Sequence, residues 1–110
     1  MKWLEIITLQ VAGKNREIAQ RKIAGLMNDM GLNSGVEKAN LYRHAMTGND
    51  LSVHLYQKSD HVDPRGSAIG FCLHSALAEY GLVSHAVWIE GRKETAEREE
   101  RNEVKTNSVS

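Results

Sequence analysis

The order of hydrophobic patterns along the chain predicts an α+β fold in which one antiparallel sheet lies under two helices. Two alternating apolar runs stand near the ends of residues 1–90, a hairpin pattern stands in the middle, and two amphipathic helical stretches separate them. This order, βαββαβ, is that of a ferredoxin-like sandwich. Such a scaffold hosts many unrelated functions, so the fold by itself predicts no reaction.

The composition is that of one soluble domain. A chain of 110 residues is expected to form a single core over residues 1–90, and its hydrophobic fraction of 41% is ordinary for a folded protein. A net charge of +0 does not favour nucleic acid or an anionic membrane surface as a partner. The single Cys72 forms no intramolecular disulfide, and no leader or long apolar span is seen, so we expect a cytoplasmic protein.

The first half of the chain shows a strand followed by a helix. Residues 3–12 are rich in β-branched and large apolar side chains and end at Gly13, which predicts a central strand buried on both faces. Asn15 is a suitable N-cap for a helix that ends at Gly31. Apolar residues recur on one side of that helix at Ile18, Ala19, Ile23, Leu26 and Met27.

The hairpin pattern consists of residues 36–46 and 51–58, with Gly48 and Asn49 between them. Gly-Asn suits a two-residue primed turn. Such a turn pairs His44 with Val53 and Tyr42 with Leu55. The pairing predicts that His44 and Tyr42 share the apolar face with Val53 and Leu55. The opposite face would then carry Leu41, Arg43, His54 and Tyr56.

The second half predicts a helix and a final strand. Asp63 and Pro64 are typical of a helix start, and the helix is expected over residues 64–80 with Cys72 on its buried stripe. Residues 82–90 then alternate, with Val83, His85 and Val87 on one face and Trp88 on the other. Residues 91–110 form a charged tail with few apolar side chains, which can become helical if ion pairs support it.

Together with this layout, two segments resemble a known group of proteins. They are SVHLY at residues 52–56 and AEYGLVSHAVW at residues 78–88. Over residues 3–90 the chain resembles the antibiotic biosynthesis monooxygenase-like group of dimeric α/β-barrel proteins. The resemblance implies a homodimer in which two sheets close into a barrel. It also implies, from some members, oxidation of quinols or polyketide phenols without a metal or flavin cofactor. Members that degrade haem use an Asn, a Trp and a His, and no such trio aligns with confidence here.

The candidate site residues are histidines and their neighbours. Five histidines are scattered without His-x-x-x-His or Cys-x-x-Cys spacing, so no metal site is predicted. His44 with Tyr42 is the first catalytic candidate, because a His on an apolar face can take a proton from a phenol-like ligand. His85 is the second. A hydrogen-bonded core histidine is the structural alternative for both. Val53, Leu55 and Trp88 are the predicted ligand contacts.

Three interpretations of the function therefore stay open at this point. The first is a small cofactor-independent monooxygenase-like protein acting on an aromatic or quinol-type ligand. The alternative is a non-catalytic dimeric module with a small-molecule-binding or regulatory role. A haem-handling protein is the third interpretation. In each case the expected partners are a second copy, bound through the sheet face, and a small apolar or aromatic ligand.

Overall fold

The computed structural model describes residues 1–30 and 35–91, so the charged tail beyond Gly91 lies outside the described residues. The elements follow the predicted order. They are β1 (Lys2–Val11), α1 (Arg16–Met30), β2 (Val36–Arg43), β3 (Asp50–Lys58), α2 (Ala68–Leu77) and β4 (Gly81–Ile89). The expected ferredoxin-like α+β fold is confirmed.

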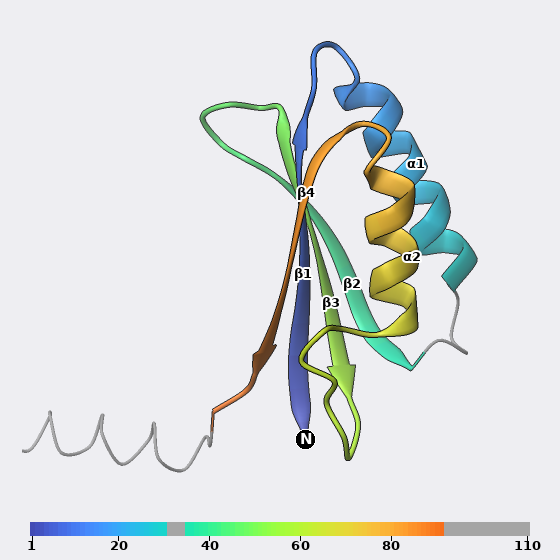
Figure 1. The fold of residues 1–110 in the computed structure, drawn as a ribbon, viewed down its shortest axis with the longest axis vertical. Helices are drawn as coiled ribbons and strands as arrows, with labels where there is room; N and C mark the ends of the chain where they lie inside the picture. Colours follow the sequence, from blue (N-terminus) through green and yellow to red (C-terminus); the bar gives the residue numbers. More distant parts are fainter. Residues whose placement is uncertain (31–34, 92–110) are drawn as a thin grey trace, which may run out of the picture.

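The four strands form one antiparallel sheet in the order β2-β3-β1-β4, and both helices lie on the same side of it (Figure 1). Side chains alternate between the two faces of a strand. On β1 the odd positions from Trp3 to Val11 are buried under the helices, whereas Leu4 and Ile6 are only half-buried. We call these two surfaces the helix-covered face and the helix-free face. The prediction that β1 is buried on both sides therefore holds for one face of the single chain.

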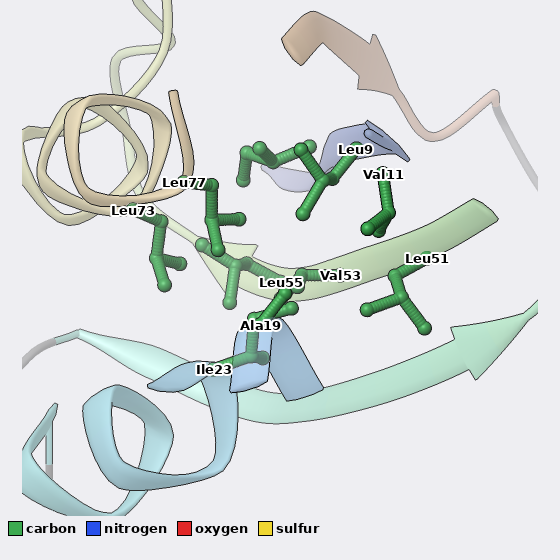
Figure 2. Close-up of a cluster of buried hydrophobic side chains, with 10 residues drawn as sticks. Leu9, Val11, Ala19, Ile23, Leu51, Val53, Leu55, Leu73 and Leu77 are labelled. Atoms are coloured by element: carbon green, nitrogen blue, oxygen red, sulfur yellow. The ribbon is translucent and has the colours of Figure 1, made fainter. Parts of the chain in front are cut away.

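The core fills the space between the helix-covered face and the two helices (Figure 2). The sheet contributes Ile7, Leu9, Leu51, Val53 and Leu55, and the helices contribute Ala19, Ile23, Leu73 and Leu77. Burying each large apolar side chain stabilises the fold by about 1.5–3 kcal/mol. Within the described residues no helix is both long and apolar enough to cross a membrane.

Helix α2 begins later than the sequence predicts. The Asp63 carboxylate accepts a hydrogen bond from the backbone N–H of Arg65 at 2.9 Å, and the backbone N–H of Gly66 donates to the Asp63 carbonyl at 3.0 Å. Gly66 then has φ of 108°, which interrupts a right-handed helix. Residues 63–66 therefore form a separate turn, and Ser67 is the N-cap of α2. The buried side of α2 is formed by Gly70, Leu73 and Leu77, and Cys72 is exposed, contrary to the prediction.

The hairpin register also differs from the prediction. Val53 pairs with Leu41 instead of His44, a shift of three positions, and Tyr42 pairs with Ser52. An odd shift exchanges the two faces of β2. The register seen here turns Leu41 towards the core. A two-residue turn at Gly48 and Asn49 would instead have placed Leu41 on the other face. The strands are joined instead by a wider loop, in which the backbone N–H groups of Met46 and Thr47 donate to His44 Nδ1 at 3.1 and 3.3 Å.

Candidate functional site

A carboxyl group lies in the interior of the sheet. Glu5 occupies a helix-covered position of β1, between Trp3 and Ile7, and is 0% exposed. Removing a carboxylate from water is costly unless hydrogen-bond donors replace the lost solvent. The surroundings of Glu5 are therefore the first place to look for chemistry.

Donors from β3 and from the start of α2 satisfy this carboxylate. Gln57 Nε2 donates to Oε1 at 2.7 Å, and the Ser67 hydroxyl donates to the same oxygen at 2.6 Å. The Ser67 backbone N–H donates to Oε2 at 3.0 Å. The Ser67 hydroxyl oxygen also accepts the N–H of Gly70 at 3.0 Å, so one side chain caps the helix and holds Glu5. A helix N-terminus with its free N–H groups favours negative charge at this point.

His85 completes the cluster from β4. Its Cα partner on β1 is Ile7, which brings its ring diagonally towards Glu5 on the same face. His85 Nε2 is hydrogen-bonded to Glu5 Oε2. A carboxylate can only accept, so Nε2 carries a proton, and in the neutral form of the ring Nδ1 keeps its lone pair. Among the described residues Nδ1 has no hydrogen-bond partner, and the His85 side chain is 10% exposed.

Two glycines make room for this arrangement. A Cβ atom added at Gly70 would collide with the Glu5 carboxyl group. A Cβ atom at Gly66 would lie 2.6 Å from His85 Nε2, closer than real Cβ contacts allow. The turn before α2 and the first turn of the helix therefore need glycine at these two positions, because the Glu5–His85 pair packs directly against their backbones.

Aromatic rings surround the outer edge of His85. The ring centroid of Phe71 lies 5.8 Å from that of His85, and the centroid of His74 lies 5.6 Å away. The His85 side chain is 10% exposed, while Phe71 is 48% exposed. The exposed part of His85 thus lies beside the rings of Phe71 and His74.

The structure separates the predicted catalytic residues. His85 lies on the helix-covered face, as predicted, and gains a carboxylate partner that the sequence analysis did not name. The predicted placement of His44 and Tyr42 on the apolar face is wrong, because of the register shift described above. His44 lies exposed in the hairpin loop, and Tyr42 is 44% exposed on the helix-free face.

The predicted ligand contacts are also dispersed. Val53 and Leu55 are 0% exposed and belong to the packed core. Trp88 is 62% exposed on the opposite side of the sheet. Trp88 lines a groove of about 500 Å³ at the end of the sheet, together with Trp3, Tyr56 and Gln57. The structure does not bring these three predicted contacts together in one pocket.

The helix-free face carries a second polar cluster. Asn40 Nδ2 donates to the Tyr42 hydroxyl at 3.0 Å, and the ring centroids of Tyr42 and His54 lie 4.5 Å apart. Burial lowers the pKa of His54 below its ordinary value. A hydrogen bond with Tyr42 raises the pKa of Tyr56. This face is therefore polar at its centre, and neither α1 nor α2 covers it.

Glu5, Gln57 and Ser67 were missed by sequence reasoning, although each leaves a signal. Glu5 is the only acidic residue in the apolar run of residues 3–12 and is in phase with Trp3 and Ile7. Ser67 is a favoured residue type for an N-cap, and Gly70 stands three positions later, where a backbone N–H can donate to the cap. Gln57 leaves the weakest signal, because it stands at the polar end of its strand.

Among the described residues, no group of three or more His, Cys, Asp or Glu side chains is arranged to hold a metal ion. The Glu5–His85 pair can carry out acid–base chemistry through its own atoms. The arrangement matches what a general base needs, namely a histidine that is oriented by a carboxylate and partly exposed.

Several solved structures have a similar fold. Rv0793 of Mycobacterium tuberculosis aligns with a TM-score of 0.65 at 16% identity, covering 84% of this chain and 98% of that one. SnoaB of Streptomyces nogalater, named as a cofactor-independent oxygenase, aligns with a TM-score of 0.66 at 12% identity over 84% and 95% of the two chains. A protein of Bordetella bronchiseptica, provisionally named an antibiotic biosynthesis monooxygenase, aligns with a TM-score of 0.62 at 14% identity over 83% and 98%.

No protein-family model matches the sequence, and the search of curated proteins found no match either. At identities of 11–16% the structural likeness establishes the fold alone. It confirms, at that level, the resemblance to the antibiotic biosynthesis monooxygenase-like group of dimeric α/β-barrel proteins.

Proposed function

We propose that this protein is a small cofactor-independent oxygenase in which His85 is the catalytic base and Glu5 is its positioning partner. The observation that carries this proposal is the pairing of His85 Nε2 with a fully buried carboxylate while the His85 side chain stays partly exposed. The oxygenase-like neighbours support the reaction class. The substrate class is an aromatic or quinol-type molecule with an acidic hydrogen.

In the first step Nδ1 of His85 takes a proton from the substrate, and the ring becomes an imidazolium. Glu5 stabilises this positive charge because its carboxylate stays at the second ring nitrogen, as in a carboxylate–histidine pair. Gln57 and Ser67 hold the carboxylate in place through their hydrogen bonds. Phe71 and His74 offer ring surfaces beside the reacting atom.

In the second step the substrate anion supplies electrons to dioxygen. For an anthrone-type ring, the CH₂ carbon loses two hydrogens and gains one oxygen atom, and the other oxygen atom leaves as water. For a quinol, loss of two electrons and two protons gives the quinone, and dioxygen becomes hydrogen peroxide. Both reactions balance with dioxygen as the oxidant, so no metal or flavin is required by the stoichiometry.

A non-catalytic binding or regulatory module is the second candidate. The observation that favours it is the complete burial of Glu5, all of whose hydrogen bonds are already satisfied within the protein. A satisfied buried network can serve to fix the packing of α2 on the sheet.

We also propose that two copies pair through their helix-free faces. Tyr42, Leu82 and Trp88 are large, exposed side chains there, at 44%, 74% and 62%. A second sheet would bury this surface, as the resemblance implies. The resulting homodimer would have an identical interface on each copy.

Oxygen uptake tests the enzymatic proposal. The purified chain is incubated with a panel of quinols and anthrone-type phenols, and its rate is compared with that of His85→Gln. His44→Gln tests the other predicted base, and His61→Gln, at an exposed position, is the matched control. Loss of a general base lowers the rate by about 10²–10⁴-fold. Uptake that is absent across the panel, or that is unchanged in His85→Gln, contradicts the proposed role of His85.

A further inference from the structure

We propose that the helix-free face binds a second copy of this chain only while His54 is neutral. The proposal rests on the sheet-to-sheet homodimer inferred above and adds that the affinity of the dimer depends on the protonation of His54. His54 lies on β3, an interior strand, and its side chain is on the helix-free face. The argument depends on which groups surround this ring.

The neighbours of His54 are neutral. Its ring nitrogen Nε2 lies 3.0 Å from Ser52 Oγ, and its ring packs against that of Tyr42 at 4.5 Å. Its cross-strand partners are Ile6 on β1 and Asn40 on β2. None of these groups can balance a positive charge on the imidazole.

The charged groups of this face lie away from His54. By strand alternation, β1 places Leu4, Ile6 and Thr8 on the face, and β4 places Ser84, Ala86 and Trp88 there. The ionisable groups are the phenols of Tyr42 and Tyr56, then Lys38 on β2, and Lys2, Lys58 and Asp50 at strand ends. Glu37 and Glu90 lie at the Lys2 end of the sheet, where they line one groove with Tyr56 and Trp88. Lys38 Nζ lies 5.6 Å from the ring centroid of Tyr56. It is a cation, and it therefore opposes protonation of a histidine on the neighbouring part of the sheet.

The carboxylate that β3 places on this face is that of Asp50, four residues along the strand from His54. At about 3.3 Å per residue it is roughly 13 Å away along the strand. At that distance in physiological salt its attraction is largely screened.

The distribution of charge also fits a second copy as the occupant. Lys2 and Lys58 are cross-strand partners at one end of the face, whereas Asp50 pairs with Gln10 at the other end. The centre of the face is uncharged on both copies, so identical surfaces meet without repulsion while His54 is neutral.

Association removes further water from His54, which favours its neutral form. The direction is already visible in the single chain, where burial lowers the pKa of His54. Association therefore weakens as pH falls towards the lowered pKa of His54, which lies below the ordinary histidine value of about 6.5. Each dimer contains two His54 side chains, so the effect of protonation on association counts once for each subunit.

Sedimentation equilibrium of the full chain tests this inference at about pH 8 and about pH 5, the second well below the ordinary histidine pKa. If only neutral His54 enters the interface, each pH unit below the pKa of His54 raises Kd by up to about 10-fold per subunit, and so by up to about 100-fold per dimer. His54→Gln keeps a polar side chain without this proton and should show the same Kd at both pH values. His61→Gln, an exposed histidine outside the sheet, should behave like the unchanged chain.

The outcomes separate this inference from the proposals on which it rests. Dimers with the same Kd at both pH values, or an equal pH effect in His54→Gln, overturn the role of His54 and leave the homodimer standing. Monomers at both pH values overturn the homodimer and the role of His54 together. Circular dichroism at the lower pH distinguishes dissociation from unfolding. Oxygen uptake by His54→Gln is measured separately and reports on the site around His85.

Discussion

Replacing Glu5 with Gln is the most direct test of the buried cluster. The two side chains have nearly the same shape, so the packing is retained while one carboxylate oxygen becomes an NH₂ group. Oε1 accepts from Gln57 and Ser67, and Oε2 accepts from the Ser67 backbone and pairs with His85. Whichever oxygen is replaced, the new NH₂ group faces donors that it cannot satisfy.

The arrangement with the least conflict places the NH₂ group towards His85. The Ser67 backbone N–H can then keep its weaker bond to Oε1, at 3.2 Å. The His85 ring must accept at Nε2, so its proton moves to Nδ1 and the outer nitrogen becomes a donor. A hydrogen bond to a charged group contributes about 1.5–3 kcal/mol, and the network loses one or two of them. We expect Glu5→Gln to lower the free energy of unfolding by about 2–4 kcal/mol.

Two measurements check this prediction. Urea unfolding gives the stability change, with Glu79→Gln, at an exposed carboxylate, as the control that should shift it by less than about 0.5 kcal/mol. Nitrogen NMR of the His85 ring gives the tautomer, with the proton on Nε2 in the unchanged chain and on Nδ1 in Glu5→Gln. Unchanged stability together with an unchanged tautomer would refute the reasoning, because the carboxylate would then hold neither the fold nor the ring.

Other substitutions extend the test to the surroundings of the cluster. Gly70→Ala should lower stability by about 1–3 kcal/mol despite its better helix propensity, because the added methyl group displaces Glu5; urea unfolding that shows a gain would contradict this. Ser67→Ala removes both the N-cap and a donor to Glu5, so the free energy of unfolding should fall by about 1–3 kcal/mol in the same assay. An almost unchanged free energy of unfolding would mean that the cap is dispensable. Leu55→Ala should cost about 2–5 kcal/mol as a core cavity, and a smaller change would mean that the core collapses around it. For His54 the lowered pKa means that its contribution to the stability of the chain is complete above about pH 6.5 and declines as pH falls towards the lowered pKa. His54→Gln should therefore flatten that part of the stability profile, and a profile of unchanged slope would speak against it.

The elements of this protein are readable in its sequence because they depend on local periodicity. The alternation of β1 and β4 and the apolar side of α1 around Ala19 and Ile23 each predict an element that is present. The starting point of α2 was misplaced because Asp63 and Pro64 are equally suited to a turn. The structure resolves this through the positive φ of Gly66 and the cap at Ser67.

The hairpin shows why a site is harder to predict than a fold. A two-residue turn and a wider loop satisfy the same local sequence, but they exchange the faces of β2. The choice depends on whether Leu41 or Tyr42 packs against Val53 and Leu55, which is a long-range packing energy. The wrong register alone placed both His44 and Tyr42 beside the core, whereas Tyr42 lies on the helix-free face.

The sequence by itself determined the order of strands and helices, the side of β4 on which His85 lies, and the absence of strong net charge. These follow from spacing along one segment, where neighbouring residues decide the outcome. Only the tertiary structure decided that Glu5, Gln57, Ser67 and His85 meet, because they come from three strands and one helix cap that are far apart in the chain. Hydrogen bonds across such separations exist only after the sheet has its register and α2 has docked on it.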